Sequence, residues 1–196
     1  MTLVAGFAYN RLVVVTLGAV VQINVAQLLK EPIGSTRNYE VNGVVDVAAS
    51  GVDSTVQGEV SLVRTDRGIL VKGTLNTEVE VICGRCLSLF RYPLMLNIQE
   101  EYFPTVDVVS GTSVALPDEP GSFAIDEYHM LDLTEAVRQY ALLAIPIKPL
   151  CRQGCTGLCP TCGHNLNLQS CGCSSEQVDP RWAVLTELAS ERKGTR

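Results

Sequence analysis

The sequence predicts an α+β protein: an antiparallel β-sheet body with a capped helix, a C-terminal zinc-knuckle module and a final short helix. Three observations predict this fold. Polar and apolar residues alternate between positions 39 and 101, as in half-buried strands. One amphipathic helical pattern follows position 132, and six of the eight cysteines gather between positions 151 and 173. With 196 residues, 46% of them hydrophobic, the chain is long enough to bury one sizeable core.

The first part of the body is predicted to hold an entry segment and a hairpin. Residues 23–30 form a short helical or extended segment, and Tyr39–Ala49 alternates as a strand does. Val56–Thr65 is a second such strand, and Asp66–Gly68 supplies a tight turn into Ile69–Leu75, which predicts a β-hairpin. The face of the second strand expected to be apolar comprises Val56, Gly58, Val60 and Leu62.

The sheet is predicted to continue through a turn that carries a C-x-x-C motif. In Thr77–Cys83 the valines are expected to point inward, whereas Glu78 and Glu80 point outward. The turn CGRC then leads into Leu89–Glu101, where Pro93 indicates an edge strand or a bulge. The apolar face of that strand comprises Phe90, Tyr92, Leu94, Leu96 and Ile98.

A loop and a helix complete the body. Val108–Gly121 is rich in Gly, Ser, Asp and Pro and is predicted to be a loop. A helix is expected over residues 132–145, with Asp132 as the N-cap, Glu135 in the capping-box position and Pro146 as the stop. Its apolar stripe comprises Leu133, Val137, Tyr140, Ala141 and Ala144.

Three regions are expected along the chain: an extra segment at 1–21, the body at 22–150 and the cysteine-rich module at 151–196. The module is predicted to end in an amphipathic helix at Pro180–Glu191, whose apolar face includes Trp182. The apolar run within the first segment is too short to span a bilayer, and no signal-peptide cleavage site follows it. We therefore expect a cytoplasmic protein without a membrane partner.

The eight cysteines predict two sites of four thiolates each. A C-x-x-C pair directs both of its sulfurs at one metal ion about 2.3 Å away. In CPTCGHN, Gly163 can take the positive φ that turns backbone N–H groups toward the sulfurs, as in a zinc knuckle. The expected ligands are Cys83, Cys86, Cys151, Cys155, Cys159, Cys162, Cys171 and Cys173.

Disulfides, iron–sulfur chemistry and a redox dithiol are the alternatives to zinc. Disulfides suit the even number of cysteines but require export, whereas close pairs in a reducing compartment are more often metal ligands. A thioredoxin-like dithiol at Cys83 and Cys86 should open a helix, but strand-like segments flank this motif on both sides. His164 is expected to lie at the surface, since the cysteines around it make it redundant as a ligand.

The charge distribution gives a weak indication about RNA. A net charge of −6 argues against a chain that coats nucleic acid non-specifically. Positive charge exceeds negative charge only after residue 136, with seven basic and four acidic residues. Lys148 and Arg152, beside Cys151, are therefore the expected weak RNA contacts, with ordinary solvated cations as the alternative.

The chain resembles the YceD family, the large ribosomal RNA subunit accumulation proteins. The residues that carry the resemblance are INVAQLLKEPIGSTRNYEV from Ile23, CGRCL from Cys83, DLTEAVRQYALLAIPIKPLC from Asp132, then GLCPTCGHNLN, CGC and DPRWAVLTEL. The resemblance implies a bacterial-type cytoplasmic factor for the synthesis, processing or stability of 23S ribosomal RNA, with no established catalytic activity. It implies contact with this RNA or its precursor, directly or through a ribosomal protein or processing factor, and no small-molecule substrate.

The resemblance also implies how the cysteines divide. Some relatives keep the first C-x-x-C but lack the late cysteine run, so the ligands are expected to occur as two sets. The first set is Cys83, Cys86, Cys151 and Cys155, and the second is Cys159, Cys162, Cys171 and Cys173. The competing division places Cys155 with the second set and leaves Cys151 free. Relatives usually begin near Gln22, so residues 1–21 are either a start site assigned too early or a genuine extra strand.

Three classes of function remain open. The first is a non-enzymatic ribosome-assembly factor with two structural zinc ions. The second is a redox or metal-dependent enzyme that uses the CGRC dithiol, and the third is a zinc-stabilised adaptor for protein interactions. The sequence contains no Ser/His/Asp set, phosphate-binding glycine loop or HExxH motif, so we expect that the chain is not an enzyme.

Overall fold

A computed structural model of the protein describes residues 12–15, 21–47, 52–117, 121–173 and 180–182. The chain divides into two compact units. The first comprises Met1–Val81 with Leu89–Pro149, and the second comprises Ile82–Ser88 with Leu150–Arg196. The cysteine-rich unit therefore includes the turn at Ile82–Ser88, which the expected boundary at residue 151 had left in the body.

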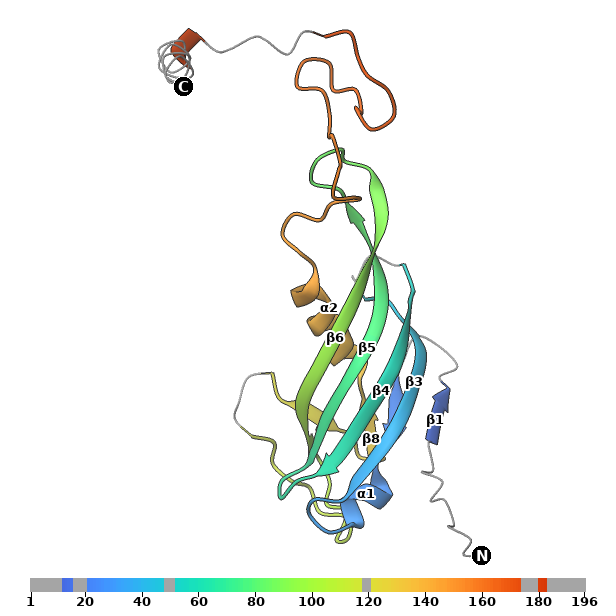
Figure 1. Cartoon of the computed structure of the whole chain (residues 1–196). Coiled ribbons are helices and arrows are strands. Elements are labelled where there is room, and N and C mark those ends of the chain that lie inside the picture. The colour runs from blue at the N-terminus through green and yellow to red at the C-terminus, as the bar shows by residue number, and fades with distance from the viewer. Residues whose placement is uncertain (1–11, 16–20, 48–51, 118–120, 174–179, 183–196) are drawn as a thin grey trace, which may run out of the picture. The chain divides into compact units, whose positions relative to one another are not determined.

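An eight-stranded sheet runs through the first unit in the order β1-β3-β4-β5-β6-β7-β8-β2 (Figure 1). The strands are β1 (Leu12–Val15), β2 (Gln22–Asn24), β3 (Thr36–Val45), β4 (Ser54–Arg64), β5 (Ile69–Ile82), β6 (Leu89–Pro104), β7 (Phe123–Ile125) and β8 (Met130–Asp132). The helical elements are α1 (Ala26–Lys30), α2 (Thr134–Ala144) and the 3₁₀ turn η1 (Pro180–Trp182). The predicted α+β class is confirmed by this mixture of strands and few helices.

The sheet is mixed, which corrects the prediction of a purely antiparallel body. β3–β4, β4–β5, β7–β8 and β2–β8 are antiparallel, whereas β1–β3 and β6–β7 are parallel. A parallel pair needs a long connection between its strands. Residues 105–122 supply such a connection between β6 and β7, but a loop of this kind carries no periodic signal from which the strand direction can be predicted.

The predicted β-hairpin is present. β4 and β5 pair from Arg64 opposite Ile69 to Gln57 opposite Asn76, and the Thr65 N–H donates to the Gly68 carbonyl in the turn. The segments Ile69–Leu75 and Thr77–Cys83, predicted separately, form one continuous strand, β5, which ends at Ile82. β6 pairs with β7 only at Tyr102–Pro104, so within the described residues Pro93 has a strand on one side only.

Alternating side chains of these strands form the core beneath one face of the sheet. Val79 is buried while Glu78 and Glu80 are exposed, as predicted. α2 packs against β6 on the buried face (Figure 1), where the Tyr140 hydroxyl donates to the Glu100 carboxylate at 2.9 Å. Among the largest fully buried side chains are Ile23, Leu28, Leu62, Ile69, Leu75, Leu96, Tyr102, Ile125, Leu131 and Leu133.

The start of α2 differs from the predicted capping box. The Asp132 carboxylate accepts the Thr134 N–H at 2.8 Å, but Glu135 binds Arg138 at 2.6 Å instead of reaching back along the chain. The guanidinium of Arg138 accordingly lowers the pKa of Glu135 to about 2. Of the predicted apolar stripe, Val137 is buried but Ala144 is exposed.

Only parts of the two ends are described. Leu12–Val15 forms β1, which lies parallel to β3 with Leu12 opposite Tyr39. Pro180–Trp182 forms η1, and the remainder of the helix predicted at Pro180–Glu191 lies outside the described residues. No helix in the described ranges is long and apolar enough to cross a membrane.

Candidate metal centres

Four cysteine sulfurs from two distant segments meet in the second unit. Cys83 and Cys86 lie on the turn after β5, and Cys151 and Cys155 follow α2. All four sulfurs lie within 4.8 Å of one another, with 3.8 Å between Cys83 and Cys155 and 3.7 Å between Cys86 and Cys151. Thiolates that are about 2.3 Å from one tetrahedral ion stand about 3.8 Å apart, so the set fits a single metal ion.

The turn that presents the first two cysteines is closed by backbone hydrogen bonds. The Cys83 N–H donates to the Ser88 carbonyl at 2.9 Å, and the Leu87 N–H donates to the Cys83 carbonyl at 3.0 Å. Leu87 takes a φ of 56°, an uncommon conformation for a residue with a branched side chain. The redox dithiol interpretation required the motif to open a helix. The turn instead runs directly into β6, so it does not.

Hydrogen bonds and burial set the protonation of the first set. The Cys151 N–H donates to the Cys83 sulfur at 3.5 Å and lowers the pKa of Cys83 to about 6. Hydrogen bonds from Ser88 lower the pKa of Cys86, whereas burial raises the pKa of Cys151 to about 12. Four thiols in contact ionise together only when a cation balances their charge, which a bound divalent metal would do.

The second set occupies the predicted knuckle. The sulfurs of Cys159, Cys162, Cys171 and Cys173 also lie within 4.8 Å of one another. The Cys159 N–H donates to the His164 carbonyl at 2.8 Å, and the Gly163 N–H donates to the Cys159 carbonyl at 2.9 Å. Gly163 has the positive φ that the sequence predicted, 71°. Backbone N–H groups of Cys162 and Thr161 lower the pKa of Cys159 to about 6.

The two sets differ in their exposure to solvent. In the first set Cys83, Cys86 and Cys155 are buried and Cys151 is half-buried. In the second set Cys159 is buried, but Cys162 and Cys173 are exposed. The structure therefore brings together the same two sets of four that the resemblance implied, with the first shielded and the second open to solvent.

Asn167 links the segments around the first set, a role that the sequence reasoning missed. Its side-chain nitrogen donates to the Cys155 sulfur at 3.3 Å. Its side-chain oxygen accepts hydrogen bonds from the Thr156 N–H at 3.0 Å and the Arg152 guanidinium at 2.7 Å. The only sequence signal was the pair of asparagines in GHNLN, close after the CPTC motif.

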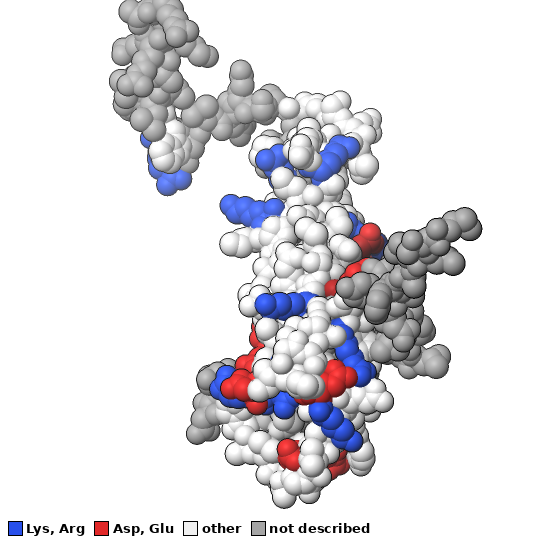
Figure 2. Space-filling view, turned by 60° about the horizontal axis from the view of Figure 1, so that its bottom comes forward, with Lys and Arg blue, Asp and Glu red and all other residues white. Residues whose placement is uncertain are grey.

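The remaining predicted site residues are not among the eight sulfur ligands. Lys148 is exposed in the first unit, while Arg152 belongs to the second and binds Asn167. His164 is exposed and contributes its backbone carbonyl only. In the lower part of the face shown in Figure 2 acidic and basic side chains are interspersed, whereas the basic side chains farther up are separated by uncharged surface.

Comparison with known proteins identifies the family. Residues 71–189 match the family model described as "Large ribosomal RNA subunit accumulation protein YceD". This match covers more than half of the chain, and the protein belongs to the YceD family.

The curated relatives carry no functional description. Uncharacterized proteins of Mycobacterium tuberculosis and Mycobacterium bovis are 33% identical over 129 residues, which is 65% of this chain and 59% of theirs. An uncharacterized protein of Mycobacterium leprae is 27% identical over 121 residues, which is 61% of this chain and 52% of that protein. The chain thus matches less than two thirds of the length of these relatives. No solved structure matches it.

Proposed function

We propose that this protein is a non-enzymatic factor for the accumulation of large-subunit ribosomal RNA, in which two zinc ions hold the cysteine-rich unit in one shape. The observation that carries the proposal is the pair of four-sulfur sets within a chain that belongs to the YceD family. The family description supplies the link to ribosomal RNA. The sulfur geometry supplies the role of the metal.

Zinc suits both sets better than the other metals that bind thiolates. Four cysteine sulfurs in a tetrahedron favour zinc or iron. Distances of 3.7 and 3.8 Å between sulfurs of the first set fit one central ion, and the sulfurs of the second set lie within 4.8 Å of one another. A cluster of several irons would hold such sulfurs farther apart. With four protein ligands an ion has no open position for a substrate, which favours a structural role over a catalytic one.

The first ion would fasten the β5–β6 turn to the segment after α2. Cys83 and Cys86 come from the turn, and Cys151 and Cys155 come from that later segment. Structural zinc contributes about 10–16 kcal/mol of binding free energy in finger peptides. This exceeds the net stability of most small domains, so the second unit should hold its shape only with metal bound.

We further propose that the protein acts in the cytoplasm on 23S ribosomal RNA or its precursor, directly or through a ribosomal protein or processing factor. Direct contact would be weak, because the chain carries a net charge of −6 and Lys148 and Arg152 would supply only a few phosphate contacts. Few contacts give low affinity and a shallow dependence of binding on salt. Lys148 is exposed and free to approach phosphate, whereas Arg152 is engaged by Asn167.

Depletion and complementation test this function in the native host. The ratio of 23S to 16S ribosomal RNA should fall on depletion and recover with the wild-type gene. Cys83→Ser, which removes a ligand of the first set, should fail to restore the ratio. Thr36→Ser, at an exposed position of β3 outside the cysteine-rich unit and outside the pocket described below, is the control and should restore it. An unchanged ratio on depletion would contradict the proposed function, and full rescue by Cys83→Ser would contradict the role of the first metal.

A charge reversal tests the direct contact with RNA. Lys148→Glu should lower binding of the zinc-loaded protein to a 23S ribosomal RNA fragment, and Lys72→Glu on β5 is the matched control because Lys72 is also exposed. Equal RNA binding by the two variants would show that Lys148 does not contact the RNA. Absence of RNA binding by the wild-type protein would favour action through a protein partner.

A further inference from the structure

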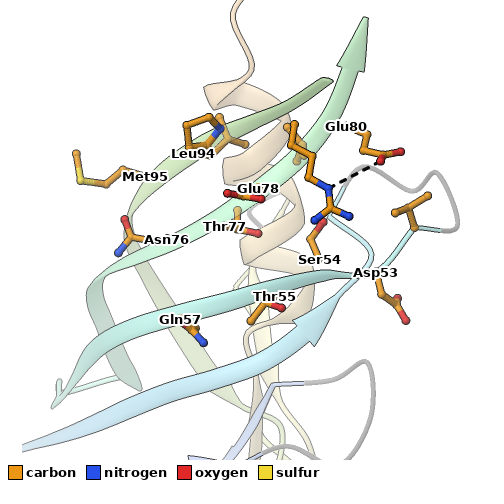
Figure 3. Close-up of a pocket in the computed structure, with 14 residues that line it drawn as sticks. Asp53, Ser54, Thr55, Gln57, Asn76, Thr77, Glu78, Glu80, Leu94 and Met95 are labelled. Carbon is orange, nitrogen blue, oxygen red and sulfur yellow. Dashed lines mark ion pairs between the residues drawn. The ribbon is translucent and has the colours of Figure 1, made fainter. Parts of the chain in front are cut away.

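A pocket of about 600 Å³ opens on the first unit, where β4 and β5 move apart (Figure 3). The pairing of the two strands ends at Gln57 opposite Asn76. β4 nevertheless begins at Ser54, and β5 continues to Ile82. Within the described residues, therefore, no strand pairs with Thr77–Ile82 on the side of β5 that faces β4.

An unpaired strand edge is a place where another strand can bind. Every second residue of an extended edge turns its backbone N–H and C=O groups outward, where they can accept a new hydrogen-bond partner. Peptides use such edges by adding a strand: the main chains hydrogen-bond, and alternate side chains enter pockets on one face. The gap beside Thr77–Ile82 offers both the edge and a pocket next to it.

The charges of the pocket indicate the chemistry of its ligand. Asp53, Glu78 and Glu80 line it, and Arg91 is its single basic residue, which gives three negative charges against one positive. Arg91 lies 4.0 Å from Glu80, so neutralisation is partial. Phosphate would be repelled here, whereas Lys and Arg side chains would be attracted. Val79, Leu94 and Met95 add apolar wall for the aliphatic stems of such side chains.

An independent feature of the same pocket also calls for a ligand. Thr77 lies in its wall (Figure 3) with 5% of its surface exposed. Its hydroxyl oxygen is buried and has no hydrogen-bond partner. Buried hydroxyls nearly always have a partner. Because this oxygen is closed to solvent, the main chain of an added strand would reach it only after a shift of the neighbouring side chains.

We infer that this cleft binds an extended basic polypeptide segment, which adds as a strand to the free edge of β5 and places alternate Lys or Arg side chains against Glu78 and Glu80. Backbone hydrogen bonds would provide the attachment, and the carboxylates would select for positive charge. The cleft lies in the sheet-bearing unit and involves none of the cysteines, so this inference does not depend on the proposed metal sites or on RNA accumulation.

Peptides of defined chemistry test it on the full zinc-loaded chain. The probe is a short fluorescent peptide that alternates lysine and valine, and its binding is followed by anisotropy and by amide NMR shifts of Thr77–Ile82. We expect saturable binding with shifts centred on this edge. The same peptide N-methylated at alternate backbone nitrogens cannot pair as a strand, and a version with glutamate in place of lysine should be repelled. Each should bind roughly tenfold more weakly or worse.

Matched variants locate the binding. Glu78→Lys should weaken binding of the lysine peptide roughly tenfold, because it places a like charge in the cleft. Glu40→Lys makes the same charge change at an exposed position of β3 outside the pocket and should leave the affinity unchanged. Far-UV circular dichroism of both variants checks that they are folded.

Several outcomes would overturn the inference. Binding that tolerates N-methylation or is weakened equally by Glu40→Lys would be non-specific charge attraction. Absence of binding at millimolar peptide would leave the edge without such a partner. Preferential binding of an oligouridylate at these amides would assign the cleft to nucleic acid. Self-association lost in Glu78→Lys would assign it to a second copy of the chain.

Discussion

The sulfur of Cys83 lies 3.8 Å from the sulfur of Cys155, although the two residues are 72 positions apart in the chain. This contact joins the β5–β6 turn to the segment after α2 within one compact unit. A link between positions so far apart restricts the unfolded chain strongly, because the entropy of closing a loop grows with its length. A metal bound at Cys83 would therefore be expected to hold the unit together.

Metal content should reveal two independent sites. We expect about two equivalents of zinc per chain in the wild-type protein, as the two sets of four sulfurs require. Cys151→Ser should leave about one, because it removes a ligand of the first set only, and Cys159→Ser should leave the other. Elemental analysis of the purified variants measures both. The competing division leaves Cys151 free, so full zinc content in Cys151→Ser would support that division and refute ours.

The second site should lose its metal first. Cys162 and Cys173 are exposed, whereas Cys83 and Cys155 are buried, so a chelator reaches the second set more easily. Zinc release to a chromogenic chelator should show a fast and a slow phase of similar amplitude. Cys159→Ser should abolish the fast phase and Cys83→Ser the slow one. Rapid alkylation of Cys83 before any chelation would instead indicate a reactive dithiol, as in the redox alternative.

Zinc should leave as the protein is acidified. Hydrogen bonds from the Cys151 N–H and the Cys162 N–H respectively lower the pKa of Cys83 and of Cys159 to about 6, from an ordinary value of 9.0. Because these values are lowered in the folded protein, the stabilisation is complete above the ordinary value and is lost as the pH falls through about 6. Protonation also competes with the metal for each sulfur.

We therefore expect zinc to be retained at neutral pH and released as the pH falls below about 6. Zinc content after buffer exchange at stepped pH values measures this release, and circular dichroism follows the accompanying loss of structure. Return to neutral pH with added zinc is the control for irreversible damage. Zinc release already at neutral pH would show that the pKa values of Cys83 and Cys159 are not lowered enough to retain the metal there.

Much of the sheet could be predicted because polar and apolar residues alternate along its strands. Val79 between Glu78 and Glu80 indicated a half-buried strand, and in the structure Val79 is buried while both glutamates are exposed. The hairpin turn at Asp66–Gly68 also followed from local residues. The β6–β7 pairing could not be predicted, because it joins residues across an irregular connection whose path depends on the whole core.

In the cysteine-rich unit, too, local features could be predicted from the sequence, whereas contacts between distant segments could not. The positive φ of Gly163 followed from the local motif, because glycine favours that conformation. The meeting of Cys83 with Cys155 depended on tertiary structure, and only the resemblance to a family indicated it. The position of Asn167 beside Cys155 left no periodic trace, because its role lies in hydrogen bonds between loops.

Asn167 should support the first metal site without touching the metal. Asn167→Ala removes the donor to the Cys155 sulfur and the acceptor of the Thr156 and Arg152 groups. Losing such supporting hydrogen bonds typically lowers metal affinity about 10–100-fold. Competition with a zinc chelator of known affinity measures the change. Asn38→Ala, at an exposed position of β3, is the control and should not change it. Unchanged affinity in Asn167→Ala would mean that the ligands hold themselves in place.

The unpartnered hydroxyl of Thr77 should cost stability in the free protein. Valine has nearly the same shape and keeps the β-branching that suits a strand. Thr77→Val therefore removes a buried hydroxyl that has no hydrogen-bond partner while preserving the packing around it. Leaving such a group unsatisfied costs about 1–3 kcal/mol. We expect Thr77→Val to raise the free energy of unfolding by about 1 kcal/mol, measured by urea denaturation of the zinc-loaded protein or by hydrogen exchange of β5 amides.

The same substitution at Thr65 should have the opposite effect. The Thr65 hydroxyl lies 2.7 Å from the Glu101 carboxylate and accepts the Gly68 N–H at 2.8 Å. Thr65→Val breaks both hydrogen bonds and leaves their partners unsatisfied, so it should lower the free energy of unfolding by about 1–2 kcal/mol. Opposite signs at the two positions would establish that the Thr77 hydroxyl lacks a partner in the free protein. Destabilisation by Thr77→Val as well would show that ordered water already binds this hydroxyl, and the argument that it awaits a ligand would fail.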